Sequence, residues 1–286
     1  MDRAAVGSGP LWTVLSAGAR PSPCEPIVQH GWKHAFALIA VALTVGAFTA
    51  CSDAGGALDR LSLGERGKVV SVQSGEAFTL DSGLAVRLAG VEAPYPDEPG
   101  GDAAKADLTK RVGGRVVELL YGGLRRDSQG RALAQVRLAD NRSWVQGVLL
   151  RDGMARVRTY ADNRAMIGPM LNDEARARIA KAGLWGQGVF RVLIPPEVGR
   201  DASGYQIVEG RVQVVTPTRQ GVYLDFTPDK RGFAARIDGK AQPDLASAGL
   251  PVQSLAGRLV RLRGVIGWNA VMAVDHPEQI EALKGG

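Results

Sequence analysis

The stretch that decides the fold is GEAFTLDSGLAVRLAGVEAPY, residues 75–95. It places two carboxylates, those of Glu76 and Glu92, on either side of Arg87. Short segments rich in apolar and β-branched residues, separated by Gly-containing turns, are typical of an antiparallel meander. We therefore expect a small β-sheet whose strand ends and turns bring these charged side chains together.

Further short strands are expected on both sides of this stretch, and three prolines end the meander before the first helix. Five short strands with a helix after the third, followed by two more helices, predict a mainly β fold. The expected architecture is a five-stranded barrel of the OB type with helices packed on it. The expected strands are 68–73, 76–80, 84–91, 115–121 and 131–138, and the expected helices are 102–113, 144–151 and 166–182.

A second strand-rich block follows the sequence IPP at 194–196. Three strands, a short helix over 241–249 and two or three further strands repeat the order of the first block. This repetition predicts a second, smaller OB-like barrel. The expected organisation is a signal or leader region at 1–50, a flexible tether at 51–65, the first barrel at 66–187, a linker at 188–203 and the second barrel at 204–286.

Composition limits the functional classes. The chain has 286 residues, 45% hydrophobic and 22% charged, which is typical of a globular protein of about two domains. Its formal net charge of +6 favours anionic partners such as nucleic acid or a membrane surface. Both cysteines, Cys24 and Cys51, precede the folded region, and only His276 lies beyond the first fifty residues. A disulfide framework, a Ser-His-Asp triad and a His-rich zinc site are therefore disfavoured.

The N-terminal region carries an apolar run at 35–50, AFALIAVALTVGAFTA, preceded by Lys33. A membrane-spanning helix needs roughly 20 such residues and a signal-peptide core roughly 7–15, so the run is nearer the second class. It ends in FTAC, which resembles a bacterial lipobox with Cys51 as the lipid anchor. We expect an exported lipoprotein of the cell envelope, membrane-anchored and facing the periplasm or outside. An uncleaved membrane helix is the alternative.

Four motifs together resemble those of the staphylococcal nuclease-like (thermonuclease) family, and the resemblance extends over residues 68–186. Their order and spacing carry it more than any single motif does. The motifs are RLAGVEAP at 87–94, DSQGRALA at 127–134, WVQGVLLRDGMA at 144–155 and the closing LW at 184–185.

This resemblance implies phosphodiester cleavage with one calcium ion, a hard cation that prefers oxygen ligands. The first metal-binding carboxylate falls on Glu76 and the second on Glu92, where the family usually has Asp. The backbone carbonyl ligand falls on Ala93. Because Glu is one methylene longer than Asp, we expect calcium binding to be weakened at this site.

The resemblance also implies two catalytic arginines, Arg87 and Arg131, which would neutralise charge developing on the phosphorus. The general base falls on Tyr95, where the family has Glu. Tyrosine titrates near pH ~10, and the loss of a positioned base typically costs ~10²–10⁴ in rate. Asp97 and Glu98 lie in the same loop and could substitute for it.

Nucleic acid or another polyanion is the expected partner, with Arg125, Arg126 and Tyr160 as candidate contacts. A solvated turn is the alternative for Arg125 and Arg126, and their charge run favours it.

Structural interpretations stay open beside the functional ones. Glu76 and Glu92 could be counter-charges without a metal, and Arg87 and Arg131 could tie strands together through ion pairs with Glu92 or Asp127. Three functions are therefore open. One is a calcium-dependent envelope nuclease, the second a catalytically degraded relative that binds nucleic acid or another anion, and the third an envelope scaffold. Whether the protein is an enzyme stays open with them.

Overall fold

The computed structural model describes residues 54–199 and 204–284, all of which belong to one compact unit, residues 50–286. The expected leader region at 1–50 and the expected lipid anchor Cys51 lie outside the described residues. Within the described ranges, no helix is long and apolar enough to cross a membrane.

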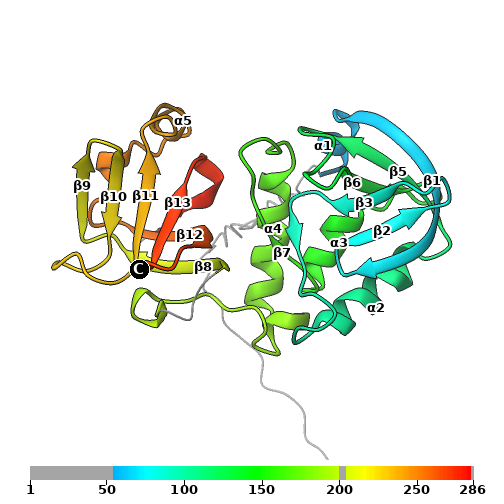
Figure 1. Ribbon diagram of the computed structural model, residues 1–286, viewed down its shortest axis with the longest axis horizontal. Coiled ribbons are helices and arrows are strands. Elements are labelled where there is room, and N and C mark those ends of the chain that lie inside the picture. Colours follow the sequence, from blue (N-terminus) through cyan, green and yellow to red (C-terminus); the bar gives the residue numbers. More distant parts are fainter. Residues whose placement is uncertain (1–53, 200–203, 285–286) are drawn as a thin grey trace, which may run out of the picture. The chain divides into compact units, whose positions relative to one another are not determined.

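The first block closes into a five-stranded barrel, as the sequence predicted (Figure 1). The strand order is β1-β2-β3-β6-β5, and the chain of pairings is antiparallel except for the parallel pair β3–β6. The long β1 closes the barrel because it pairs with β5 on one side and with β2 on the other. The strands are β1 (Ser62–Ser74), β2 (Ala77–Leu80), β3 (Ala85–Leu88), β5 (Val116–Tyr121) and β6 (Ala132–Leu138).

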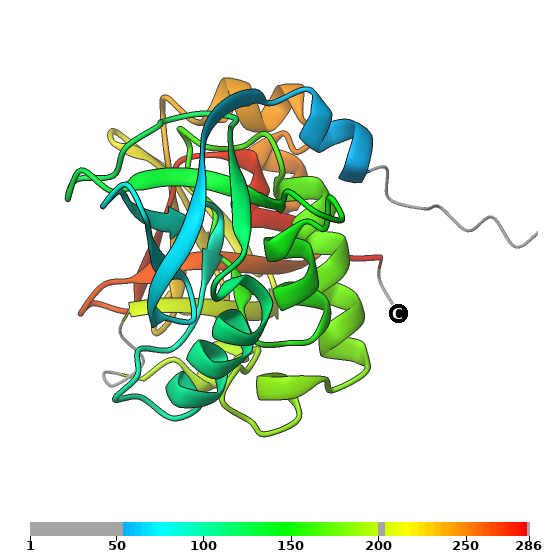
Figure 2. The ribbon, with the colours of Figure 1, turned by 90° about the vertical axis from the view of Figure 1, so that its right-hand side faces the viewer.

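Three helices cover this barrel: α2 (Gly101–Val112), α3 (Val145–Arg151) and α4 (Ile167–Ile179). They gather on one side of the strands (Figure 2). α2 packs on β1 and α3 packs on β6 and α4. Every residue of β6 is buried, because one face of this strand points into the barrel and the other lies beneath α3. A short 3₁₀ helix, η1 (Gly183–Trp185), buries Trp185 at the end of the block.

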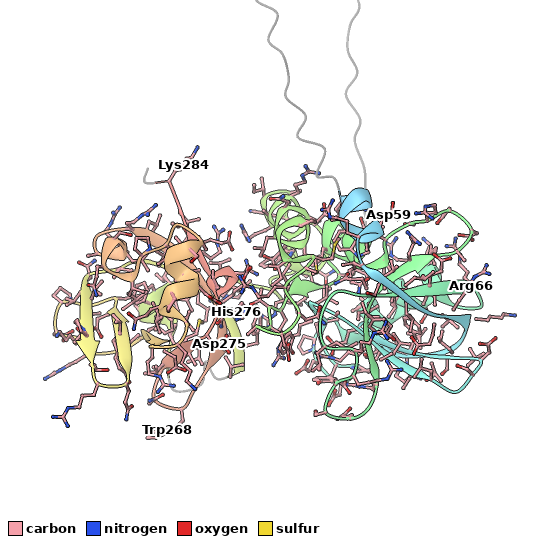
Figure 3. The ribbon with its side chains drawn as sticks, turned by 90° about the horizontal axis from the view of Figure 1, so that it is seen from above. Asp59, Arg66, Trp268, Asp275, His276 and Lys284 are labelled. Carbon is pink, nitrogen blue, oxygen red and sulfur yellow. The ribbon has the colours of Figure 1, made fainter. Side chains whose placement is uncertain are left out.

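The expected flexible tether over 51–65 is wrong for its described part. Helix α1 (Ala54–Asp59) occupies this segment, and β1 already begins at Ser62. Leu58 is buried in the core of the first barrel, and the carboxylate of Asp59, which Figure 3 marks, pairs with Arg137 and Arg142. The apolar anchor and the two ion pairs fix this segment on the barrel.

The expected linker over 188–203 is also partly structured. Phe190, Leu193 and Val198 are buried, and a 3₁₀ turn, η2 (Pro195–Glu197), follows. Leu193 forms a bridge with Val208 of the next strand. Phe190 packs into the core of the first block, whereas Leu193 and Val198 pack into that of the second.

The second block repeats the strand order of the first. Its sheet runs β9-β10-β11-β13-β12, with β8 and β14 also paired to β12, and the pair β11–β13 is parallel. Only two residues separate β8 from β9. The two strands therefore act as halves of one strand, of which β9 pairs with β10 and β8 pairs with β12. The elements are β8 (Gly204–Arg211), β9 (Val214–Thr218), β10 (Gly221–Asp225), β11 (Ala234–Asp238), α5 (Gln242–Ser247), β12 (Leu259–Ile266), β13 (Val271–Val274) and β14 (Ile280–Ala282).

This topology supports the expected second OB-like barrel. The first strand of this block is divided. Its first half, β8, pairs with β12 up to Arg211, and its second half, β9, pairs with β10. The block has its own apolar core, which includes Phe233, Leu262 and Met272.

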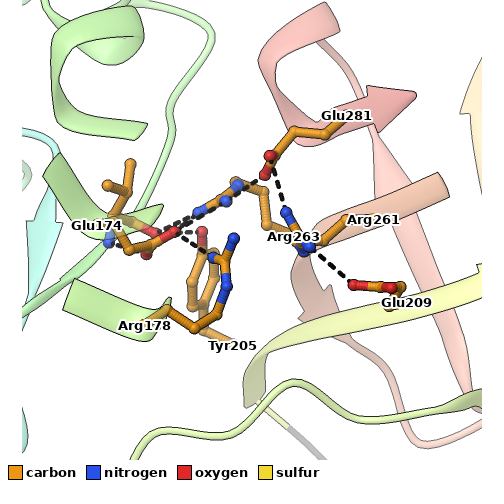
Figure 4. A network of polar contacts seen from close by, with 8 residues as sticks. Glu174, Arg178, Tyr205, Glu209, Arg261, Arg263 and Glu281 are labelled. Atoms are coloured by element: carbon orange, nitrogen blue, oxygen red, sulfur yellow. Dashed lines mark hydrogen bonds and ion pairs between the residues drawn. The ribbon is translucent and has the colours of Figure 1, made fainter. Parts of the chain in front are cut away.

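A buried ionic network links α4 to the second block (Figure 4). Arg263, which is 0% exposed, lies 3.0 Å from the Glu174 carboxylate and 2.5 Å from that of Glu281. Glu174 is also 0% exposed and accepts the backbone N–H of Val157. Burial alone would raise the pKa of Glu281, but the charge and hydrogen bond of Arg263 hold this pKa below its usual value. The helix expected at 166–182 therefore buries the charged side chain of Glu174 against Arg263 of the second block.

Candidate functional site

Glu76, the expected metal ligand in the turn between β1 and β2, pairs with Arg87, the expected catalytic arginine, which was one of the structural alternatives. Glu76 is only 5% exposed, and the Ser74 hydroxyl accepts its backbone N–H. Arg87 lies on β3, opposite Ala77 of β2. Its Nε donates to Glu76 Oε1 at 3.1 Å, and the backbone N–H of Ala93 donates to Glu76 Oε2 at 3.1 Å. Both carboxylate oxygens of Glu76 are therefore occupied.

The second predicted carboxylate, Glu92, pairs with two arginines that the sequence did not suggest. It ends the short strand β4 (Val91–Glu92), which pairs with β7 (Arg156–Val157). Arg156 Nε lies 2.9 Å from Glu92 Oε2, and Arg158 Nη1 lies 2.9 Å from Glu92 Oε1. Each oxygen of Glu92 thus has its own guanidinium.

These carboxylates, as arranged, do not fit a calcium ion. A Ca²⁺ site takes 6–8 oxygen ligands, many of them carboxylate oxygens. The oxygens of Glu76 and Glu92 already accept from three guanidinium groups and one backbone N–H. The backbone N–H of Ala93, the residue whose carbonyl was expected to bind the metal, donates to Glu76. In the part of the chain that the structure describes, no three His, Cys, Asp or Glu side chains gather as metal ligands.

Aromatic rings join the three arginines into one cluster. The ring of Tyr160 lies 6.0 Å from the Arg87 guanidinium and 5.5 Å from that of Arg158. Tyr205, from β8, lies 5.3 Å from Arg158 and 5.1 Å from Arg156. Such distances are within the range of cation–π attraction. We call these five residues, Arg87, Arg156, Arg158, Tyr160 and Tyr205, the arginine–tyrosine cluster.

Charge and burial keep the cluster cationic and ordered. Burial alone would lower the pKa of Arg87, but the neighbouring Glu76 charge raises it above its ordinary value. Burial raises the pKa of Tyr205 to about 12. The Tyr205 hydroxyl donates to the carbonyl of Val157 at 2.7 Å, and Arg156 donates to the carbonyl of Tyr205 at 2.8 Å. The second block therefore holds the arginines in place.

The candidate base Tyr95 lies at the rim of this region. It is 60% exposed, and its backbone N–H donates to Glu98 Oε2 at 2.7 Å. The loop is held close to α2, since a Cβ on Gly101 would lie 1.7 Å from the Tyr95 carbonyl oxygen. Tyr95, Glu92 and Arg158 all line one pocket of about 770 Å³. Its assignment to the general-base position stays a prediction.

The other predicted arginines are engaged in ion pairs or ring contacts outside the arginine–tyrosine cluster. Arg131 Nε pairs with Asp127 Oδ2 at 2.7 Å, within its own turn, which was one of the structural alternatives. Arg125 lies over the ring of Tyr121 at 4.5 Å, and Arg126 pairs with Glu65.

The Tyr121 hydroxyl also donates to Glu65. This hydrogen bond, together with Arg126 and against a smaller effect of burial, lowers the pKa of Glu65 to about 2. The basic run at 125–131 is thus tied to its own side of the barrel.

Sequence reasoning missed Arg156, Arg158 and Tyr205. One signal was present: the alternation R-V-R at 156–158 places both arginines on one face of a strand. Their partner Glu92 lies more than sixty residues earlier, and Tyr205 belongs to the other block. No local pattern connects these positions.

Comparison with known proteins supports the family resemblance. Residues 85–187 match the family described as staphylococcal nuclease homologue. This part of the chain is a staphylococcal nuclease homologue domain. The Staphylococcal-like nuclease CAN1 of Arabidopsis thaliana is 30% identical over 118 residues, which cover 41% of this chain. The matched part is 34% of that relative, so the chain spans about a third of its length.

The matched region begins at Ala85, whereas the barrel begins at Ser62. Strands β1 and β2, with Glu76 between them, therefore complete the nuclease homologue domain from outside the matched residues.

Proposed function

We propose that the nuclease homologue domain binds single strands of nucleic acid through the arginine–tyrosine cluster. The observation that carries this proposal is the gathering of three guanidinium groups and two tyrosine rings, of which those of Arg156, Arg158 and Tyr205 line one pocket. Guanidinium groups recognise phosphates, and the half-buried ring of Tyr160 can stack on a base without regard to sequence, while the buried Tyr205 holds the arginines. The family membership of residues 85–187 supports a phosphodiester ligand.

A second candidate function is calcium-dependent phosphodiester hydrolysis by the same domain. The match of residues 85–187 to the nuclease homologue family favours it, together with the sequence resemblance that assigns a catalytic arginine to Arg87 and metal carboxylates to Glu76 and Glu92. It requires Arg156 and Arg158 to release Glu92, and Glu76 to give up its present partners. Binding requires only that a phosphate compete with Glu92 for Arg156 and Arg158, so we place it first.

The test measures binding and cleavage separately on the full chain. Fluorescence anisotropy with a labelled single-stranded oligonucleotide should give an affinity that falls about sevenfold between 50 and 200 mM salt, as expected for two phosphate contacts. Arg158→Ala removes one contact and should weaken binding about fivefold at 0.1 M salt. A matched control is Arg115→Ala, whose side chain has similar exposure and pairs with Asp140.

Product formation is followed in parallel with calcium or EDTA. Salt-sensitive binding that EDTA leaves intact supports the first function. Cleavage that requires calcium and disappears in Arg87→Ala supports the second. If neither binding nor cleavage occurs, both candidate functions are wrong, and the envelope scaffold is the hypothesis that stays open.

We also propose, from the sequence alone, that the chain is exported and tethered to a membrane through a lipid on Cys51. Cys51→Ser should abolish incorporation of labelled fatty acid and release the protein from the membrane fraction. Cys24→Ser is the control, since it removes the other cysteine and keeps FTAC intact. A Cys51→Ser protein that is still lipid-labelled would exclude the lipobox.

A further inference from the structure

A pocket of about 480 Å³ lies on the first barrel, and no carboxylate of the described residues lines it. Its charged lining consists of two arginines, Arg60 after α1 and Arg125 after β5. Both side chains are exposed, so a ligand in the pocket can reach both guanidinium groups. The pocket beside Glu92 differs, since that carboxylate already accepts hydrogen bonds from its arginines.

Arg60 lies next to Asp59 in the sequence, yet the two side chains do not pair. Asp59 Oδ1 lies 2.7 Å from Arg137 Nη1 and 2.7 Å from Arg142 Nη2. Within residues 54–199 and 204–284, the Arg60 side chain forms no ion pair. An exposed guanidinium without a counter-charge attracts anions.

Arg125 and the next residue, Arg126, differ in their partners. Arg126 pairs with Glu65, which also accepts the hydroxyl of Tyr121. The Arg125 guanidinium instead lies over the Tyr121 ring at 4.5 Å, within the range of cation–π attraction. This contact orients the side chain but does not neutralise its charge. In the described part of the chain, Arg125 forms no ion pair, so the pocket has two uncompensated positive charges.

Small and polar groups complete the lining of the pocket. They include the Ser62 hydroxyl and the backbone at Gly122 and Gly123. A Cβ on Gly122 would lie 2.6 Å from that of Ala165, and a Cβ on Gly123 would lie 2.2 Å from the Asp162 carbonyl oxygen. Guanidinium and hydroxyl groups donate hydrogen bonds, and the oxygens of a phosphate accept them. A phosphate group therefore suits this lining in both charge and hydrogen bonding.

One turn connects this pocket to the arginine–tyrosine cluster. Tyr160 starts the turn, and its carbonyl accepts the N–H of Asn163 at 3.1 Å. The Asp162 carbonyl accepts the N–H of Leu124 at 3.1 Å, which fixes the turn to the segment after β5. Ala165 lines the pocket and follows Tyr160 closely in the chain, so their Cα atoms are at most about 18 Å apart. Since an OB fold binds roughly 4–16 nucleotides, one strand can span both places.

We propose that this pocket binds a phosphate group of the nucleic-acid strand that occupies the arginine–tyrosine cluster, with Arg60 and Arg125 as its charged partners. The inference rests on the proposed function and extends it, because it gives the strand a second point of contact. The turn shared with the cluster favours a strand over the phosphate of a lipid headgroup as the ligand.

The test measures the affinities of oligothymidylates of two to sixteen nucleotides for the full chain, by fluorescence anisotropy in EDTA. Strands that reach both places should bind at least about fivefold tighter at 0.1 M salt than strands that reach the cluster alone, because one further phosphate contact releases more counterions. Between 50 and 200 mM salt, the affinity of a long strand should fall about eighteenfold, against about sevenfold for a short one.

Arg60→Ala and Arg125→Ala should each weaken binding of the long strand about fivefold at 0.1 M salt and leave the dinucleotide unaffected. Arg158→Ala should weaken both. The matched control is Arg66→Ala, which removes an exposed arginine of β1 that does not line the pocket (Figure 3). We expect this control to keep the gain in affinity with strand length.

The outcomes separate this inference from the proposed function. A gain with length that neither Arg60→Ala nor Arg125→Ala reduces, or no gain at all, overturns the inference and leaves binding of short strands at the cluster intact. If no strand of any length binds, the proposed function fails and the inference fails with it. Vesicles of phosphatidylglycerol form the last comparison. If the two variants weaken vesicle binding but not strand binding, the pocket takes a lipid headgroup and the inference is wrong.

Discussion

Replacing Arg263 with alanine is expected to lower the free energy of unfolding by about 3–5 kcal/mol, the usual cost of leaving one partner of a buried ion pair alone. Arg263 is the charge that compensates Glu174, and both residues are 0% exposed. Without it, the Glu174 carboxylate keeps only the N–H of Val157 and a 3.5 Å contact with Arg178. Burial without compensation penalises the charged form strongly.

Urea denaturation followed by circular dichroism measures this effect. The matched control is Arg231→Ala, which removes an arginine whose side chain is 88% exposed and 4.0 Å from Asp229. We expect the control to leave the unfolding midpoint in place. The double variant Arg263→Met with Glu174→Gln should recover much of the loss, since it removes both buried charges. A change below about 1 kcal/mol in Arg263→Ala would contradict the network as drawn in Figure 4.

The strands were predictable because their signals are local. Apolar alternation and Gly-containing turns placed β2, β3, β5 and β6 within a few residues of their bounds. Where the prediction ran too long, a backbone feature explains it. The strand expected at 84–91 ends at Leu88 because Gly90 adopts a φ of 78°, in the left-handed region, and turns the chain before β4.

The site was predictable only in its local pairs. Arg131 and Asp127 are four residues apart, and Glu76 and Arg87 lie on neighbouring strands of one meander, so both pairings were among the alternatives that the sequence left open. The pairing of Glu92 with Arg156 and Arg158 depends on β4 meeting β7, which no periodicity encodes. The burial of Glu174 likewise depends on Arg263 of the second block. From sequence alone, a charged residue in a helix is expected to be exposed to solvent, because its distant buried partner is not visible in the local pattern.

Glu92→Gln is expected to strengthen binding of single-stranded nucleic acid about tenfold at 0.1 M salt. Glu92 now holds Arg156 and Arg158 through one carboxylate oxygen each. Removal of its charge leaves one more net positive charge at the pocket, which contributes about fivefold by counterion release from a single strand. The released guanidinium groups can then make charge-assisted hydrogen bonds to phosphate, which adds to the gain.

The matched control is Glu98→Gln. Glu98 lines the same pocket, but its carboxylate accepts the backbone N–H of Tyr95. This change removes the same charge without releasing an arginine. We therefore expect a smaller gain in affinity, which comes only from the weaker electrostatic repulsion of the strand. The comparison is made by anisotropy in EDTA and then in calcium.

The two candidate functions predict different outcomes for Glu92→Gln. If Glu92 restrains the arginines, the variant binds more tightly, and calcium makes no difference to the change. If Glu92 is a calcium ligand, the variant loses calcium-dependent cleavage and gains nothing in EDTA. Weaker binding of Glu92→Gln in EDTA would show that Glu92 orients the arginines toward phosphate instead of competing with it. The effect of Glu92→Gln therefore distinguishes a domain that hydrolyses a nucleic-acid strand from one that only binds it.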